Sequence, residues 1–185
     1  MLVINFQSIT NKGTELYNII ACSLPDIIIG TESHLDPNYN SAKILPHGIP
    51  PEHRYNTYRK DRKELINKNG GGVIILVRPD IKACECNDLN TDCEIKWIKI
   101  QANPKDQILV GAYYRPPDSD QKPIEELQKS LSKIKTNSNY KNAKIFLGGD
   151  FNLGDIDWDY DTTQTGARNK HLNDSLINIL NVNYL

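Results

Sequence analysis

Five side chains that could bind a cation or a phosphate stand at the ends of short apolar runs in this 185-residue sequence. Glu32 follows the run 26–30 and Asp150 follows the run 144–147, while the other three are two amides and a phenol, Asn5, Asn152 and Tyr114. Open α/β sheets bind ligands at the carboxyl ends of their strands. If these strand ends meet, their oxygen atoms would suit Mg²⁺, which takes few protein carboxylates and completes its shell with water and phosphate oxygens.

The segment Gly148–Asn152 is the strongest of these signals. Its two glycines follow an apolar run and permit a positive φ or a close approach of the backbone, and two polar side chains then flank Phe151. Each of the other residues also has an ordinary explanation. Asn5 fits a turn, Glu32 fits a solvated carboxylate, and Tyr114 fits a packing aromatic beside a proline turn.

Several other patterns resemble known binding or catalytic motifs and can be excluded. Asp155, Asp157 and Asp159 imitate the start of a calcium-binding EF-hand loop, but the position that requires glycine holds Tyr160. The run Gly70–Gly72 precedes a strand rather than a helix and lacks the spacing of a phosphate-binding loop. No histidine is expected to act as a general base, because none is expected at a strand end beside an acidic partner.

The elements that must position these residues are short apolar strands that alternate with amphipathic helices. This pattern is typical of α/β or α+β layering, and without a linker or repeat it predicts one domain over residues 1–185. Helices are predicted from about residue 14 to Pro25, from near Pro123, and over 167–181. The expected apolar face of the first is Leu16, Ile19, Ile20 and Leu24, and that of the second is Ile124, Leu127, Leu131 and Ile134. Residues 36–53, which hold four prolines, are predicted to be a long surface loop. Strands are predicted at 2–6, 26–30, 55–59, 73–77, 95–100, 107–114 and 144–147, with 95–100 and 107–114 as an antiparallel hairpin.

The composition excludes several classes of protein. The formal charge is −1, from 22 Lys plus Arg and 23 Asp plus Glu, which argues against a passive nucleic-acid coat protein but not against an enzyme. The longest apolar run, 73–77, is too short for a membrane span, and the first residues do not resemble a signal peptide. We therefore expect an intracellular protein without a disulfide-linked partner, whose reduced thiols are Cys22, Cys84, Cys86 and Cys93.

Five motifs then occur in order along nearly the whole chain. They are Asn5-Phe6-Gln7-Ser8-Ile9, Thr31-Glu32-Ser33-His34-Leu35, Arg59-Lys60-Asp61-Arg62 before Gly70-Gly71-Gly72-Val73, Tyr114-Arg115-Pro116-Pro117, and Gly148-Gly149-Asp150-Phe151-Asn152-Leu153 leading to Ile156-Asp157-Trp158. By these motifs the sequence resembles the endonuclease/exonuclease/phosphatase superfamily. Within it, the sequence looks most like the apurinic-like endonuclease domain of non-LTR (LINE-type) retrotransposons.

The resemblance implies a four-layered α/β sandwich, in which two mixed β-sheets pack face to face between outer helices. It also implies Mg²⁺-dependent hydrolysis of a phosphodiester in DNA, with Mn²⁺ as an alternative cation, and a nuclear site of action. Glu32 would bind the cation with support from Asn5, and Asp150 would activate the attacking water that Asn152 positions. Tyr114 would contact the phosphate or the leaving oxygen. Four basic residues would contact the nucleic acid, namely Arg59, Lys60, Arg62 and Arg115.

One departure from the family pattern affects these expectations. Family members carry a late Ser-Asp-His motif, and no such tripeptide occurs in this sequence. We therefore expect a fold that lacks its last strands, incomplete at the C-terminus, with impaired catalysis. Two alternatives stay open: an inactive retroelement remnant that binds nucleic acid weakly or not at all, and a phosphodiesterase or phosphatase of the same fold that acts on RNA, on an abasic site or on a phosphorylated small molecule.

Overall fold

The computed structural model describes residues 1–62, 70–101, 103, 106–140 and 142–183. The first part of the chain forms a four-stranded sheet in the order β1-β2-β4-β3. The first two strands pair in parallel and the other pairs are antiparallel, so the sheet is mixed. Its strands are β1 (Leu2–Asn5), β2 (Ile27–Thr31), β3 (Asn56–Lys60) and β4 (Val73–Val77).

The second four-stranded sheet follows in the chain and has the order β5-β6-β7-β8. Its strands are β5 (Ala83–Glu85), β6 (Glu94–Gln101), β7 (Gln107–Tyr114) and β8 (Lys144–Asp150). The predicted hairpin is confirmed, because β6 and β7 pair antiparallel from Glu94 opposite Tyr114 to Gln101 opposite Gln107. β7 and β8 pair in parallel, which makes this sheet mixed as well.

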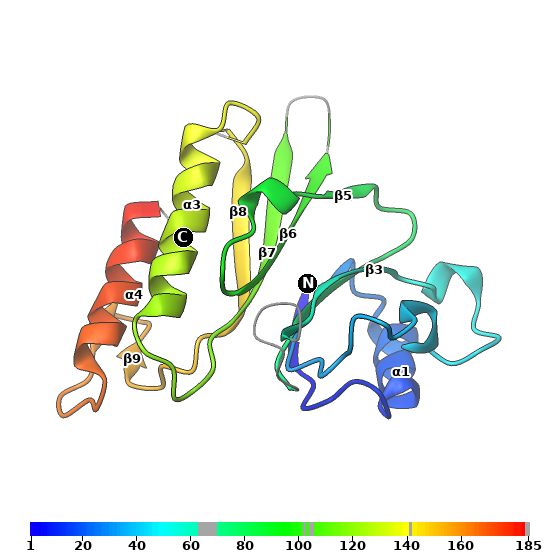
Figure 1. The fold of residues 1–185 in the computed structure, drawn as a ribbon. Coiled ribbons are helices and arrows are strands. Elements are labelled where there is room, and N and C mark those ends of the chain that lie inside the picture. The colour runs from blue at the N-terminus through cyan, green and yellow to red at the C-terminus, as the bar shows by residue number, and fades with distance from the viewer. Residues whose placement is uncertain (63–69, 102, 104–105, 141, 184–185) are drawn as a thin grey trace.

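The two sheets lie against each other (Figure 1). Alternate residues of their strands form one buried apolar cluster between them. β2 and β4 are buried along their whole length. Their Ile and Val side chains face the second sheet on one side and α1 (Gly13–Ser23) on the other. Continuous β-branched runs are typical of strands covered on both faces.

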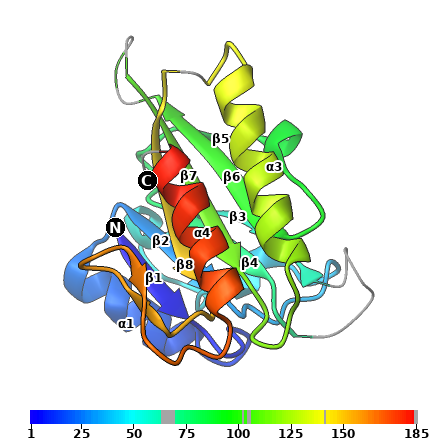
Figure 2. The same cartoon turned by 90° about the vertical axis from the view of Figure 1, so that its left-hand side faces the viewer.

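Two helices cover the outer face of the second sheet, α3 (Lys122–Thr136) and α4 (Lys170–Asn183), as Figure 2 shows. The predicted core face of α3 is confirmed, since its apolar residues at helical spacing are at most 2% exposed: Ile124, Leu127, Leu131 and Ile134. With α1 outside the first sheet, the order of layers is helix, sheet, sheet, helix. The predicted four-layered sandwich is therefore confirmed.

The predicted face of α1 is wrong at two positions. Leu16 and Ile20 are buried, but Ile19 is 37% and Leu24 is 46% exposed. Leu24 follows the helix with a left-handed backbone (φ 41°), which takes its side chain out of the helical spacing.

Smaller elements complete the fold. The loop predicted at 36–53 contains two short 3₁₀ helices, Ser41–Lys43 and Pro51–His53. Between β8 and α4, the strands β9 (Ile156–Asp157) and β10 (Thr162–Thr163) pair as a small antiparallel hairpin. Among the described residues, no helix is long and apolar enough to cross a membrane.

Candidate active site

The ends of β1, β2 and β8 bring three of the sequence-predicted residues together. The amide nitrogen Nδ2 of Asn5 donates a hydrogen bond to Glu32 Oε1 at 2.8 Å and another to Asp150 Oδ2 at 3.2 Å. Asn5 and Glu32 extend from the first sheet and Asp150 from the second, so the cluster forms only where the two sheets meet. Tyr114 lies beside it, since it pairs with Asp150 across the parallel β7–β8 ladder.

The orientation of Asn5 is set by its second group. Its Oδ1 accepts a hydrogen bond from the backbone N–H of Gln7 at 3.1 Å, which directs Nδ2 toward the two carboxylates. Asn5 therefore holds Glu32 and Asp150 near each other and offsets part of their mutual repulsion. Its oxygen is engaged with the backbone, so the predicted role of Asn5 beside a cation stays a prediction.

Left-handed backbone conformations concentrate around these strand ends. Non-glycine residues with positive φ include Gln7 (44°) and Ser8 (78°) after β1, Glu32 (50°) and His34 (53°) after β2, and Asn152 (48°) after β8. Such conformations cost free energy and persist where the surrounding structure holds them, often at functional sites. Their grouping at one end of the sandwich supports this region as the candidate site.

The glycines before Asp150 permit the positive φ and the close approach of the backbone that the sequence suggested. Gly149 has a φ of 144°, and a Cβ there would lie 1.8 Å from the carbonyl oxygen of Tyr113. Beyond the strand, the N–H of Asn152 donates to Asp150 Oδ1 at 3.0 Å, and Asn152 Nδ2 donates to the carbonyl of Arg115 at 2.7 Å. Gly149 thus permits the close approach of β8 to Tyr113, and the two hydrogen bonds orient Asp150 and Asn152.

Tyr114 lies in a network that the sequence did not indicate. The guanidinium carbon of Arg62 is 5.4 Å from the centroid of the Tyr114 ring, within the range of a cation–π interaction. Arg62 Nε forms an ion pair of 2.7 Å with Oε1 of Glu94, whose Oε2 accepts the N–H of Gly72. Glu94 stands opposite Tyr114 on β6, so one buried carboxylate positions the cation that covers the phenol ring.

Burial controls the protonation of this network. It raises the pKa of the Tyr114 phenol, and the neighbouring Glu32 carboxylate raises it further. Burial also raises the pKa of Glu94, although the Gly72 N–H and the Arg62 guanidinium oppose the shift. Tyr114 is thus held as a neutral phenol, which can donate a hydrogen bond to an anionic group.

The expectation that no histidine lies at a strand end beside an acidic partner is wrong. His34 Nε2 is 3.6 Å from Glu32 Oε2, and the imidazole is 36% exposed. Glu32 and His34 are two residues apart, and both have left-handed backbones on either side of the buried Ser33. Because neither residue is extended, strand alternation does not explain this contact, and the closeness of Glu32 and His34 in the sequence was the signal that it offered.

Three of the four predicted nucleic-acid contacts are occupied with hydrogen bonds inside the protein. Arg59 Nη2 donates to the carbonyl of Tyr39 at 2.8 Å, among others in that loop. Lys60 is only 8% exposed, and its Nζ donates to carbonyls in the 91–93 segment. Arg115 is 1% exposed and donates to carbonyls of the turn that follows it. Contact of these residues with nucleic acid stays a prediction.

The donor set fits a hard divalent cation with few protein ligands. The Glu32 side chain is 22% exposed and Asp150 is half-buried, so their oxygens can reach a cation that also binds water. Within the described ranges, no group of three or more His, Cys, Asp or Glu residues could hold a metal alone. Mg²⁺ suits this arrangement, because it binds through one or two carboxylates and keeps several waters and substrate oxygens.

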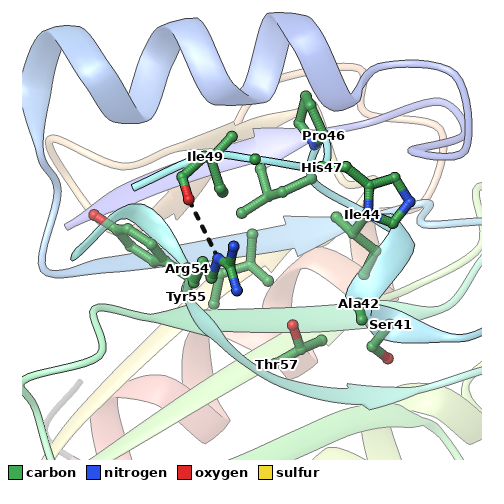
Figure 3. A pocket seen from close by; sticks show the side chains of 12 residues that line it. Ser41, Ala42, Ile44, Pro46, His47, Ile49, Arg54, Tyr55 and Thr57 are labelled. Carbon is green, nitrogen blue, oxygen red and sulfur yellow. Dashed lines mark hydrogen bonds between the residues drawn. The ribbon is translucent and has the colours of Figure 1, made fainter. Parts of the chain in front are cut away.

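Two hollows can be compared with this site. An open hollow of about 410 Å³ is lined by the segment 149–154, which includes Asp150 and Asn152, and by Trp158. A more enclosed cavity of about 290 Å³ lies away from it, where Arg54 Nε donates to the Ile49 carbonyl at 3.3 Å (Figure 3). No carboxylate lines that cavity, so it lacks the chemistry of the strand-end cluster.

Comparisons with known proteins give one family and several solved structures. A model of the Endonuclease/Exonuclease/phosphatase family matches residues 5–176. Similar structures include the endonuclease domain of TRAS1, a telomere-specific non-LTR retrotransposon (16% identity, TM-score 0.65), and the AP endonuclease LMAP from Leishmania major (11%, 0.68). The 3′ phosphatase NExo from Neisseria bound to a product DNA hairpin is also similar (16%, 0.59).

These alignments span almost the whole of this chain but only part of the other proteins. They cover 98, 97 and 96% of this chain and 71, 65 and 69% of TRAS1, LMAP and NExo, respectively. No curated protein matches the sequence. At identities of 11 to 16%, the structural likeness supports the fold.

Proposed function

The chain belongs to the endonuclease/exonuclease/phosphatase family, and from this premise we propose that it is a divalent-cation-dependent nuclease that hydrolyses phosphodiester bonds in DNA. One observation carries the proposal. The Asn5 amide bridges Glu32 and Asp150 at 2.8 and 3.2 Å, at the point where the two sheets meet. Two oriented carboxylates beside a neutral phenol are the groups that water activation and phosphate recognition need.

Each residue takes a role that follows from its contacts. Glu32 holds the cation, and Asn5 keeps the Glu32 carboxylate in place. When bound, the cation supplies Lewis acidity that offsets the negative charge of the phosphate. Asp150 accepts the proton of the attacking water through its carboxylate, which Asn152 orients. Tyr114 donates a hydrogen bond from its neutral phenol to a phosphate oxygen or to the leaving oxygen.

We also propose that the four basic residues have two different roles. Arg62 lies on the ring of Tyr114, the residue that we propose contacts the phosphate, and so acts beside it. Arg59, Lys60 and Arg115 act by holding the surrounding loops through their hydrogen bonds to backbone carbonyls. The retrotransposon origin and nicking of chromosomal DNA in the nucleus are part of this proposal, supported by the motifs around Asp150 and by the likeness to the TRAS1 domain.

The test is nicking of supercoiled plasmid by the purified chain with Mg²⁺ or Mn²⁺, after circular dichroism has established that the protein is folded. We expect nicking that EDTA abolishes and that Glu32→Ala and Asp150→Asn each reduce by at least about a hundredfold. Glu52→Ala, an exposed carboxylate on a 3₁₀ helix, is the matched control and should leave the rate unchanged.

Parallel substrates separate the alternatives. Cleavage confined to an abasic-site oligonucleotide, or release of phosphate from a 3′-phosphorylated end without nicking, would assign the same site to a different phosphoester. A folded chain that leaves every substrate intact with either cation would refute the proposed hydrolysis. Nucleic-acid binding without hydrolysis would then be the remaining alternative.

A further inference from the structure

An exposed tryptophan lies beside the proposed catalytic residues. Trp158 begins the turn between β9 and β10 and is 52% exposed. Its ring centroid is 6.3 Å from that of Phe151, which in turn is 5.3 Å from the buried Tyr113. These three rings, tilted by 41° and 53° against one another, form a continuous series of aromatic contacts from the core of the second sheet to the surface. The indole is therefore supported from below, although half of it faces solvent.

The exposed indole shares a hollow with the proposed chemistry. Trp158 lines the open hollow of about 410 Å³ whose other walls include Asp150 and Asn152. A group bound against the indole would thus lie next to the carboxylate that we propose activates water. An indole combines a large flat apolar face with a polar N–H, and tryptophan is therefore enriched at binding interfaces.

The segment around Trp158 is acidic, because four carboxylates lie within three residues of it in the sequence: Asp155, Asp157, Asp159 and Asp161. Asp155 Oδ2 accepts the N–H of Arg168, and Asp157 Oδ1 accepts the N–H of Asp159. The four carboxylates repel the sugar–phosphate backbone, so the indole is poorly placed to bind a phosphate group. The uncharged face of a nucleobase does not suffer this repulsion, and every base has a face that can stack on an aromatic ring.

We propose that Trp158 is a stacking platform for the nucleobase of the nucleotide next to the cleaved phosphate. This inference rests on the proposed function, since the phosphate is placed by Glu32 and Asp150. The faces of bases within a duplex are already stacked on their neighbours and must be unstacked before they can contact the indole. The platform therefore favours single-stranded DNA, or an unpaired nucleotide, over a fully paired duplex.

The chain offers a direct optical test. Of its two tryptophans, Trp97 is fully buried and Trp158 is exposed, so quenching by acrylamide and by a bound base reports on Trp158. The probe is a short oligothymidylate, added in EDTA to prevent hydrolysis. We expect the oligonucleotide to quench Trp158 emission and to protect it from acrylamide, and Trp158→Phe to remove both changes while binding is retained.

Affinity is measured separately by fluorescence anisotropy of a labelled oligonucleotide. Trp158→Ala should weaken binding about tenfold, in line with the effect of losing one stacked base. Tyr160→Ala is the matched control, because Tyr160 is 78% exposed on the same turn but does not line the hollow. It should change the affinity less than about twofold. The unchanged emission of buried Trp97 in Trp158→Phe verifies that this variant is folded.

The outcomes separate the inference from the function on which it rests. Equal affinities of wild type and Trp158→Ala, or unquenched Trp158 emission when anisotropy shows saturation, would overturn the platform even if plasmid nicking is intact. Equal losses in Trp158→Ala and Tyr160→Ala would also overturn it, since the effect would then belong to the turn as a whole. If the folded wild type neither nicks the plasmid nor binds the oligonucleotide, the proposed function itself is refuted, and the platform with it.

Discussion

Replacement of Glu94 by alanine tests whether the buried network beneath Tyr114 holds this end of the sandwich together. The Glu94 side chain is 5% exposed, and it accepts hydrogen bonds from Arg62 Nε and from the N–H of Gly72. Alanine removes both acceptors at once. The guanidinium then loses its counter-charge, and the buried N–H loses its partner.

The magnitude follows from the burial of the two partners. Removing one member of a buried ion pair costs about 3–5 kcal/mol, because the other charge is left uncompensated. The Arg62 side chain is 17% exposed and can regain some water, so we expect the lower end, about 3 kcal/mol. Domains of this kind have about 5–15 kcal/mol of stability, so the variant should still fold. Glu94→Gln keeps an acceptor and should lose about 1–2 kcal/mol.

Urea unfolding followed by circular dichroism measures these changes. A double-mutant cycle with Arg62→Ala should give a coupling free energy of about 1–3 kcal/mol, as expected for residues in direct contact. Glu125→Ala, an exposed carboxylate on α3, should stay within about 0.5 kcal/mol of wild type. In the nicking assay, Glu94→Ala should lower the rate even where the protein is fully folded, because Arg62 no longer stays on the Tyr114 ring.

Two results would refute this reasoning. Additive losses in Glu94→Ala and Arg62→Ala would mean that the 2.7 Å ion pair contributes no net coupling. An unchanged free energy of unfolding in Glu94→Ala, with an unchanged nicking rate, would mean that neither the ion pair nor its position beneath Tyr114 matters.

Three further predictions concern single side chains around the same strand ends. Asn5→Asp places a third carboxylate between Glu32 and Asp150 and should lower the nicking rate at least about tenfold; an unchanged rate would argue against the bridging role. Tyr113 is fully buried and its hydroxyl has no partner among the described residues, so Tyr113→Phe should stabilise the fold by about 1 kcal/mol in urea unfolding. Burial raises the pKa of Tyr113 above its ordinary 10.0, so above pH 10 the folded state keeps a proton that the unfolded state loses. The stability that depends on this proton is full below pH 10 and falls as the pH rises beyond it. Thermal unfolding should therefore show a smaller loss of stability at alkaline pH in Tyr113→Phe than in the wild type. Gly149→Ala should destabilise by more than about 3 kcal/mol, because its Cβ would lie 1.8 Å from a backbone oxygen; a smaller change would mean that the strand can shift.

Local periodicity accounts for the parts of the fold that the sequence predicts well. The continuous Val and Ile run of β4 and the helical spacing of apolar residues in α3 each depend on neighbours close in the chain. The glycine pair before Asp150 is also a local signal, and the conformation of Gly149 agrees with it. The resemblance to a known family adds the order of the layers, which periodicity alone leaves open.

The site was less predictable because its contacts join distant parts of the chain. Asn5 and Asp150 are 145 residues apart. Glu94 reads as an ordinary strand residue until the fold brings Arg62 and Gly72 to it. Arg115 reads as an exposed cation beside prolines, yet it is almost fully buried by carbonyls of its own turn. A charged side chain has many partners within reach, and only the assembled fold decides between them.

The two sheets are built from consecutive stretches of the chain. The first sheet ends with β4 at Val77 and the second begins with β5 at Ala83, with the exposed Pro79 and Asp80 between them. Each stretch carries only part of the site, since Glu32 belongs to the first and Asp150 to the second. If Glu32 and Asp150 act together as proposed, a chain cut at this link would yield two inactive pieces, and recovery of nicking on mixing them would report directly on the association of the two sheets.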